Sequence, residues 1–260
     1  MSIDVYFEAG MKFNWTKPED GHAIFPGAVF PDRGGIENGP ADGLVVASEK
    51  PATVMNYMGI HPAATGSRRL PRVINGIRQI EYRWCDYTPG RTTTIALNHA
   101  GKSYDIITGP MSGCLVTTWR NGQNIYASHS GTSDKKSDNT TLKREFNRYI
   151  RRHQSGVPRS IKGFLPDRLW TAAEMAELMA RFGIQRVPDI FAIVTATGRM
   201  CSVLMGKVPD NRSSTGQWVS LGVKQCTNIM NYNDITAFCA VAPSRAPVRA
   251  APPPRVPVRV

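Results

Sequence analysis

Two residues of this chain, Cys114 and His129, have the types and the spacing for acyl-transfer chemistry. His129 follows Cys114 by fifteen positions, and between them two β-rich runs, 115–119 and 124–128, flank the pair Asn121-Gly122. Asn and Gly accept the positive φ angles of tight hairpin turns, so the pattern predicts a β-hairpin that brings Cys114 and His129 together at its base. A thiol with an imidazole beside it is the minimal equipment for cysteine nucleophilic catalysis.

Small residues surround both candidates. Cys114 follows Ser112-Gly113, and Ser130-Gly131-Thr132 follows His129. Small side chains let the backbone and a substrate approach the thiol closely, and the backbone N–H groups near Ser112 and Gly113 are candidates to bind an oxyanion. A lone cysteine is more often a core side chain than a catalyst. The combination of tripeptide, hairpin and histidine favours the catalytic interpretation here.

These same residues carry a resemblance to a known family. Ser112-Gly113-Cys114, the hairpin and the run 125–132 resemble the catalytic core of the cytotoxic necrotizing factor and Burkholderia lethal factor family. Those bacterial toxins deamidate one glutamine of a host protein, and the chemotaxis receptor deamidase CheD shares their fold. The close match covers 105–132, and a looser match to the lethal factor runs from 193 to 221. Nearly all of the first hundred residues lie outside the resemblance.

The resemblance implies a protein glutamine deamidase, a hydrolase that acts on a side-chain carboxamide. It implies Cys114 as the nucleophile, His129 as the base, and Thr108 as the third member, which orients the imidazole through its backbone carbonyl as in the lethal factor and CheD. The necrotizing factor instead draws this carbonyl from a valine well upstream, so the third member stays open. Met111 stands where the family usually has leucine, an apolar exchange that should leave the nucleophile's setting intact.

The family also implies partners and a place of action. The expected partner is a host protein substrate, such as a Rho-type GTPase or a translation-initiation helicase, and the expected role is that of a secreted toxin or virulence effector in the host cytosol. Residues 1–8 lack the basic and apolar regions of a Sec signal. The five cysteines form no C-x-x-C pair, so the sequence predicts neither a metal site nor a disulfide framework, and no cofactor is expected.

Charge supports a second class of function. The formal net charge of +12 indicates acidic partners, and it is concentrated in a basic segment, 143–153, and in the Pro/Arg-rich stretch 243–260. The alternatives are therefore a basic nucleic-acid-binding or scaffolding protein without catalysis, or a transglutaminase that uses the same Cys-His pair. Nucleic-acid binding is disfavoured because the chain carries no recognisable nucleic-acid fold signature.

The helices and strands that must position Cys114 and His129 indicate a mixed α/β (α+β) protein. We expect either a β-sandwich or a mixed central sheet, flanked by two or more helices. At 260 residues we expect one catalytic domain over 1–242, with Gly/Pro-rich loops in 20–67 and a disordered tail over 243–260. Thr171 and Glu174 form a capping box that begins a helix ending near Gly183, and the apolar spacing at 142–150 predicts another helix with one basic face. Strands are expected at 80–84, 91–97, 103–108, 190–195, 200–205, 218–223 and 235–241.

Overall fold

The protein is described by a computed structural model. The Gly/Pro-rich stretch 20–67, apart from 53–60, and the predicted tail 243–260 lie outside the described residues. The structure describes residues 2–14, 53–60, 78–85, 87, 92–99, 101–121, 123–132, 134, 139–140, 142–144, 146–147, 151, 160–208 and 217–240.

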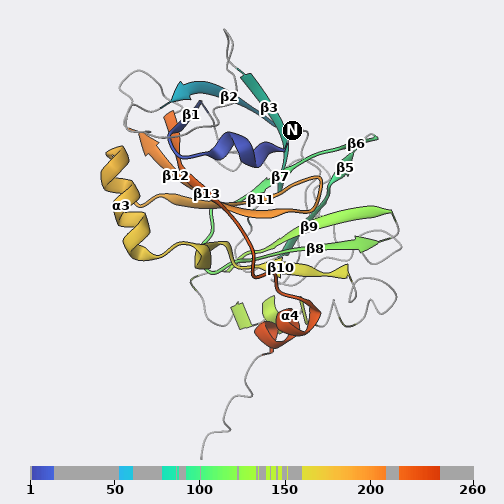
Figure 1. Cartoon of the computed structure of the whole chain (residues 1–260). Helices are drawn as coiled ribbons and strands as arrows, with labels where there is room; N and C mark the ends of the chain where they lie inside the picture. Colours follow the sequence, from blue (N-terminus) through green and yellow to red (C-terminus); the bar gives the residue numbers. More distant parts are fainter. Residues whose placement is uncertain are drawn as a thin grey trace, which may run out of the picture.

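A closed barrel of seven strands forms the larger part of the fold (Figure 1). The strands are β1 (Met11–Asn14), β2 (Thr53–Ile60), β3 (Arg78–Cys85), β7 (Ile106–Thr108), β11 (Asp189–Val194), β12 (Met200–Val208) and β13 (Gln217–Gln225). They are ordered β1-β13-β12-β11-β7-β3-β2 around the barrel. Neighbouring strands are antiparallel except β3 and β7, which run parallel.

A second sheet carries the predicted hairpin. Its strands are β4 (Thr92–Ala96), β8 (Leu115–Asn121), β9 (Asn124–Ser130) and β10 (Lys162–Phe164), in the order β10-β8-β9-β4. β8 and β9 pair antiparallel with Asn121 opposite Asn124, so the predicted hairpin is confirmed, and Asn121 itself lies in β8. A small ribbon of β5 (Asn98–His99) and β6 (Lys102–Ser103) stands apart.

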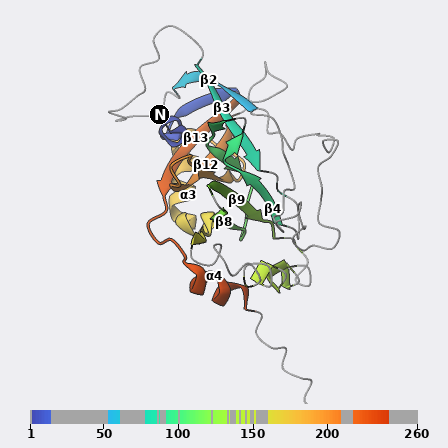
Figure 2. The same ribbon diagram turned by 90° about the vertical axis from the view of Figure 1, so that its right-hand side faces the viewer.

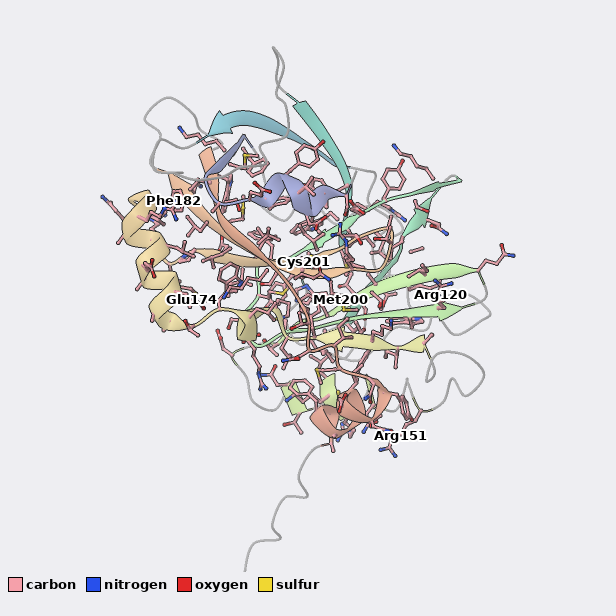
Figure 3. The ribbon with its side chains drawn as sticks, viewed as in Figure 1. Arg120, Arg151, Glu174, Phe182, Met200 and Cys201 are labelled. Atoms are coloured by element: carbon pink, nitrogen blue, oxygen red, sulfur yellow. The ribbon has the colours of Figure 1, made fainter. Side chains whose placement is uncertain are left out.

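The second sheet packs against the outside of the barrel, and one apolar layer joins them. Alternating residues of each barrel strand point to opposite sides: Trp84, Ile107 and Phe191 pack in the barrel interior, whereas their neighbours face the second sheet. The joining layer contains Cys85, Ile106, Ala192, Val194 and Met200 from the barrel, and Ile95, Val116, Ala127 and Phe164 from the second sheet. Figure 3 labels Met200, which belongs to this layer, and its neighbour Cys201, which packs in the barrel interior.

Helices cover the surfaces that the two sheets leave open. The short η1 (Ile3–Phe7) packs with the barrel core, and η2 (Pro166–Leu169) leads into α3 (Ala172–Phe182), which lies against the outside of the barrel. α4 (Tyr232–Cys239) covers the far face of the second sheet together with helical residues at 142–144 and 146–147 (Figures 1 and 2). Among the described residues, no helix is long and apolar enough to cross a membrane.

The capping box and the basic helix are confirmed where the structure describes them. Thr171 accepts a hydrogen bond from the Glu174 amide, and Gly183 ends α3 with a left-handed φ of 67°. Leu142 and Phe146 are buried on one side of the second helix, as its apolar spacing predicts. The predicted residues 148–150, 152 and 153 of that helix lie outside the described part.

Two strand predictions are wrong in instructive ways. Residues 235–241 were expected as a strand, but they belong mostly to α4, because the Asn231 side chain caps the helix through a second capping box with Asp234. Ile235 and Cys239, four residues apart, then share one buried face. The expected strand 103–108 is divided into β6 and β7, separated by Tyr104 and Asp105.

The predicted mixed α+β class is confirmed. The sequence predicted a β-sandwich or a mixed central sheet. The structure instead has a closed barrel with a second sheet packed on it. Strands β1, β2 and β10 were not predicted, because β1 and β10 are short and β2 lies within the Gly/Pro-rich stretch.

Candidate active site

The hairpin places Cys114 and His129 on one face of the second sheet. Leu115 pairs with Ser130 and Val116 pairs with His129. Since side chains alternate along a strand, Cys114, two residues before Val116, projects from the same face as Val116 and His129. This face is the one that packs on the barrel, so both candidate residues lie between the two layers.

Thr108 holds one ring nitrogen of the histidine. It is the last residue of β7, and its alternation with Ile107 turns it out of the barrel toward the second sheet. Its hydroxyl Oγ1 lies 2.6 Å from His129 Nδ1, and both residues are buried. The structure thus joins the two predicted residues, but the bond runs through the Thr108 side chain rather than through its backbone carbonyl.

The other ring nitrogen of His129 is unpaired. His129 is fully buried, and its Nε2 makes no hydrogen bond to any described residue, Cys114 included. Thr93, which lies directly opposite His129 on β4, likewise has a buried Oγ1 without a hydrogen-bond partner among these residues. A buried polar atom left unpaired costs about 1–3 kcal/mol. Such atoms are uncommon in folded proteins, and each calls for an explanation such as a catalytic role or a bound water.

Burial determines the charge of the imidazole. Removal from water lowers the pKa of His129 to about 3, because the charged form is the more strongly hydrated one. The resting imidazole is therefore neutral at physiological pH. If Nδ1 carries the proton and donates it to Thr108, Nε2 presents a free lone pair.

The thiol of Cys114 is enclosed by two neighbours. Its sulfur lies 3.5 Å from the hydroxyl of Thr132 and 4.0 Å from the carbonyl oxygen of Ser112. Only 1% of the residue is exposed, so the thiol is covered in this conformation. The other four cysteines are also buried and unbridged.

The segment that carries Cys114 crosses from the barrel to the second sheet. It leaves β7 at Thr108 and reaches β8 at Leu115. Gly109, with a φ of 149°, lies so close to β11 that a Cβ would stand 2.6 Å from the Phe191 ring, and Gly113 has a left-handed φ of 75°. The Gly109-Pro110 bond is cis. Glycine at these two positions allows the turn that delivers Cys114 to the sheet.

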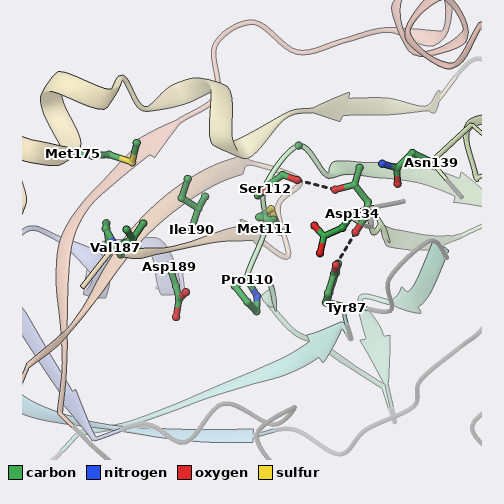
Figure 4. A pocket seen from close by; sticks show the side chains of 13 residues that line it. Tyr87, Pro110, Met111, Ser112, Asp134, Asn139, Met175, Val187, Asp189 and Ile190 are labelled. Atoms are coloured by element: carbon green, nitrogen blue, oxygen red, sulfur yellow. Dashed lines mark hydrogen bonds between the residues drawn. The ribbon is translucent and has the colours of Figure 1, made fainter. Parts of the chain in front are cut away.

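A pocket of about 640 Å³ opens above this segment (Figure 4). Its wall includes Ser112 and Gly113, so the pocket meets the residues that precede the thiol. Thr132 also lines the pocket. Its carbonyl accepts a hydrogen bond from the Tyr87 hydroxyl, and its own hydroxyl donates to the Ser112 carbonyl, as the dashed lines of Figure 4 show. The remaining lining residues are Pro110, Met111, Asp134, Asn139, Met175, Val187, Pro188, Asp189 and Ile190.

Comparisons with protein-family models, with curated proteins and with solved structures found no match. The arguments about function therefore depend on the residues and their geometry.

The structure places the five predicted site residues in two contact groups. The Thr108 hydroxyl bonds to His129, whereas Cys114 contacts the Ser112 carbonyl next to Gly113, and the described contacts include no hydrogen bond between Cys114 and the unpaired Nε2 of His129. Sequence reasoning assigned no role to Tyr87 or Thr132. Thr132 is part of the motif after His129, but Tyr87 lies well upstream and no local signal marks it. Among the described residues, no group of three or more His, Cys, Asp or Glu is placed to hold a metal ion.

The basic helix borders the site only in part. Asn139 lines the pocket, and Lys143 lies 4.1 Å above the ring of Phe238 on α4. Arg151 is exposed and lies near α4 in Figure 3, and it is not among the residues that line the pocket. The described part of this helix thus offers packing on the second sheet rather than a ring of cations around the pocket.

Proposed function

We propose that this protein is a protein glutamine deamidase that uses Cys114 as nucleophile and His129 as general base. The observation that carries the proposal is the state of His129: Thr108 holds Nδ1 at 2.6 Å, while the buried Nε2 has no partner among the described residues. A neutral imidazole with one nitrogen fixed and the other free is equipped to accept a proton. Cys114 lies on the same face of the hairpin.

The first half of the reaction forms a thioester. Nε2 of His129 accepts the Cys114 proton, and the sulfur attacks the carboxamide carbon of a glutamine side chain, converting the C=O oxygen to an oxyanion. Backbone N–H groups near Ser112 and Gly113 are the candidates to stabilise this charge. The imidazolium then donates its proton to the nitrogen as the C–N bond breaks, and ammonia leaves.

Water completes the cycle. His129 accepts a proton from water, the resulting hydroxide attacks the thioester carbon, and the C–S bond breaks with return of the proton to sulfur. The sum is glutamine plus water to glutamate plus ammonia. An amine in place of water would give transglutamination from the same thioester.

The covered thiol requires a local opening before substrate can enter. Thr132 and Ser112 lie between the sulfur and the pocket, and hydrogen bonds in resting catalytic sites often tighten only when substrate binds. A side-chain carboxamide that enters from the pocket would displace this cover and reach the sulfur from the side of Ser112 and Gly113.

A deamidase-toxin-like fold and a host protein as substrate, such as a Rho-type GTPase or a translation-initiation helicase in the host cytosol, belong to the same proposal. They are supported by the resemblance of 105–132 and by the grouping of its residues at one site. The pocket accepts an extended chain segment more readily than a buried small molecule, because it is broad and borders the exposed Val187.

The test compares host-cell proteins incubated with the wild-type chain and with Cys114→Ser, by intact-mass and peptide mass spectrometry. We expect a gain of about 1 Da at one glutamine with the wild type only, since replacement of NH₂ by OH adds that mass. Cys114→Ser should keep the thermal midpoint of the wild type. Equal deamidation by a folded Cys114→Ser chain would rule out the nucleophile, and salt-sensitive binding of nucleic acid without any deamidation would favour the non-catalytic alternative.

A further inference from the structure

Tyr87 brings a hydroxyl to the pocket from outside the hairpin. It lies between β3 and β4 in the sequence, and it lines the pocket together with Ser112 and Gly113. Its hydroxyl donates to the Thr132 carbonyl at 2.6 Å, and its ring centroid lies 5.4 Å from that of His129. The phenol thus lies beside the proposed base and beside the residue that covers the thiol.

The peptide before Cys114 is turned the wrong way to bind an oxyanion in this conformation. The Ser112 carbonyl oxygen lies 4.0 Å from the Cys114 sulfur and accepts a hydrogen bond from the Thr132 hydroxyl at 2.7 Å. In a trans peptide the carbonyl and the following N–H point in opposite directions, so the Gly113 N–H is directed away from the thiol. This backbone candidate therefore leaves the role to another donor.

Tyr87 keeps its proton and lies within electrostatic reach of the thiol. Burial is the main cause that raises the pKa of Tyr87, and negative charge on Cys114, followed by that on Asp134, raises it further. The phenol is therefore neutral at physiological pH and offers an O–H. Tyrosine hydroxyls are among the side-chain donors that stabilise oxyanions.

The present acceptor of the Tyr87 hydrogen bond has the same chemistry as the proposed substrate. Thr132 presents a carbonyl oxygen to Tyr87, and a glutamine carboxamide presents another. The Thr132 hydroxyl also lies 3.5 Å from the Cys114 sulfur, so a substrate that reaches the thiol must displace Thr132. Displacement frees the Tyr87 hydroxyl as the carboxamide oxygen enters.

We propose that Tyr87 is a further catalytic residue, whose hydroxyl moves from the Thr132 carbonyl to the carboxamide oxygen of the substrate and stabilises the oxyanion. This rests on the proposed deamidase function. As the S–C bond forms, the electron pair of the C=O bond moves to oxygen, and Tyr87 donates a hydrogen bond without giving up its proton. When the C–N bond breaks, that electron pair restores the C=O bond.

The test removes the hydroxyl and keeps the ring. Tyr87→Phe retains the packing on His129, and Tyr104→Phe, the same exchange at a half-buried tyrosine that does not line the pocket, is the matched control. Ammonia release is measured on the best substrate from a library of glutamine-containing peptides. Loss of an oxyanion donor costs about 10²–10³ in kcat. We expect a loss of this size in Tyr87→Phe with little change in KM, and wild-type kinetics in Tyr104→Phe.

Two measurements at Cys114, both read by peptide mass spectrometry, need no turnover. Iodoacetamide alkylates the thiol by displacing iodide and forms no oxyanion, so Cys114 should be labelled no more slowly in Tyr87→Phe than in the wild type. Propanal adds reversibly to the thiol: the S–C bond forms, and the thiol proton goes to the carbonyl oxygen, which then lies where the oxyanion would. Protection of Cys114 against labelling should need about fivefold more propanal in Tyr87→Phe, the factor that one ordinary hydrogen bond gives.

The outcomes separate the two proposals. A wild-type chain that deamidates no peptide and no host protein overturns the proposed function, and protection by propanal then decides whether Tyr87 binds an oxygen beside the sulfur. With an active wild type, an unchanged kcat in Tyr87→Phe overturns the catalytic role. Slower alkylation in Tyr87→Phe would mean instead that Tyr87 acts on the thiol through His129. Equal protection by propanal in Tyr87→Phe and wild type contradicts the donor role in either case.

Discussion

Two properties of His129 have opposite effects on its ability to accept a proton. Its burial lowers the pKa to about 3, which makes it a weak base alone, while its free Nε2 makes it available as an acceptor. In the proposed mechanism a thiolate next to the ring would favour the imidazolium electrostatically. Thr108 supports this by keeping the ring in one orientation.

The buried imidazole predicts acid sensitivity of the fold. In the unfolded chain the histidine pKa is near 6.5. Between pH 6.5 and about 3, His129 therefore binds a proton in the unfolded state but not in the folded state. Stability is therefore complete above pH 6.5 and falls as the pH drops, by up to about 1.4 kcal/mol per pH unit. Urea unfolding at pH 7, 5 and 4 measures this.

The matched control is His129→Asn, which keeps a polar group near Thr108 and does not titrate. Between pH 7 and pH 4 its free energy of unfolding should fall less than that of the wild type, by up to about 3 kcal/mol. Parallel pH curves for the two proteins would contradict a neutral buried imidazole.

At the scale of elements, the segment between β7 and β8 connects the barrel to Cys114, the proposed nucleophile. It begins at Thr108, which holds His129, and ends at Cys114, so a shift of β7 moves the acceptor of the imidazole and the thiol together. Gly109 is the point of closest approach, because the Ile190 carbonyl and the Phe191 ring leave no room for a side chain.

Gly109→Ala should therefore destabilise the protein and weaken activity at once. The added Cβ would meet Phe191 at 2.6 Å and the Ile190 carbonyl at 3.0 Å, and overpacking of this kind costs about 1–3 kcal/mol beyond the strain of a positive φ. Gly198→Ala is the control, since Gly198 also has a positive φ of 84° but nothing within 4 Å of the added atom. Chemical denaturation should show the larger loss for Gly109→Ala. Similar losses in the two variants would mean that β11 yields to the new side chain without cost.

At the scale of the whole molecule, the net positive charge of the chain is not reflected in the described lining of the pocket. The net charge is +12, yet the described lining of the pocket has Asp134 and Asp189 and no Lys or Arg. Four arginines and six prolines gather in 243–260, beyond the described residues. A net positive charge that the described pocket lining does not share suits attraction to an acidic surface rather than catalysis.

A chain that ends at Ala242 should keep its thermal midpoint and its turnover on purified substrate. The removed residues offer too little apolar surface to offset the entropy of ordering them. Differential scanning calorimetry and ammonia release test the two halves of this prediction, with the full chain as control. A midpoint lowered by many degrees would place the domain boundary beyond 242.

The sequence alone determined the local features of this protein. Thr171 with Glu174 specified the start of α3, and the two β-rich runs around Asn121-Gly122 specified the hairpin, although Asn121 itself lies in β8, paired with Asn124. Each depends on bonds or turns within a few residues. Even there, 235–241 was predicted as a strand, because a short apolar run does not distinguish a strand from a helix and the Asn231 cap was overlooked.

Tertiary structure decided what depends on contacts distant in sequence. Barrel closure, which pairs β1 with β13, and the approach of Tyr87 to Thr132 join residues far apart along the chain, and no local pattern encodes such pairings. The use of the Thr108 hydroxyl, rather than its carbonyl, follows from the alternation of β7 against the second sheet. The neutral state of His129 arises in the same way, since two packed layers must meet before an imidazole between them loses its water.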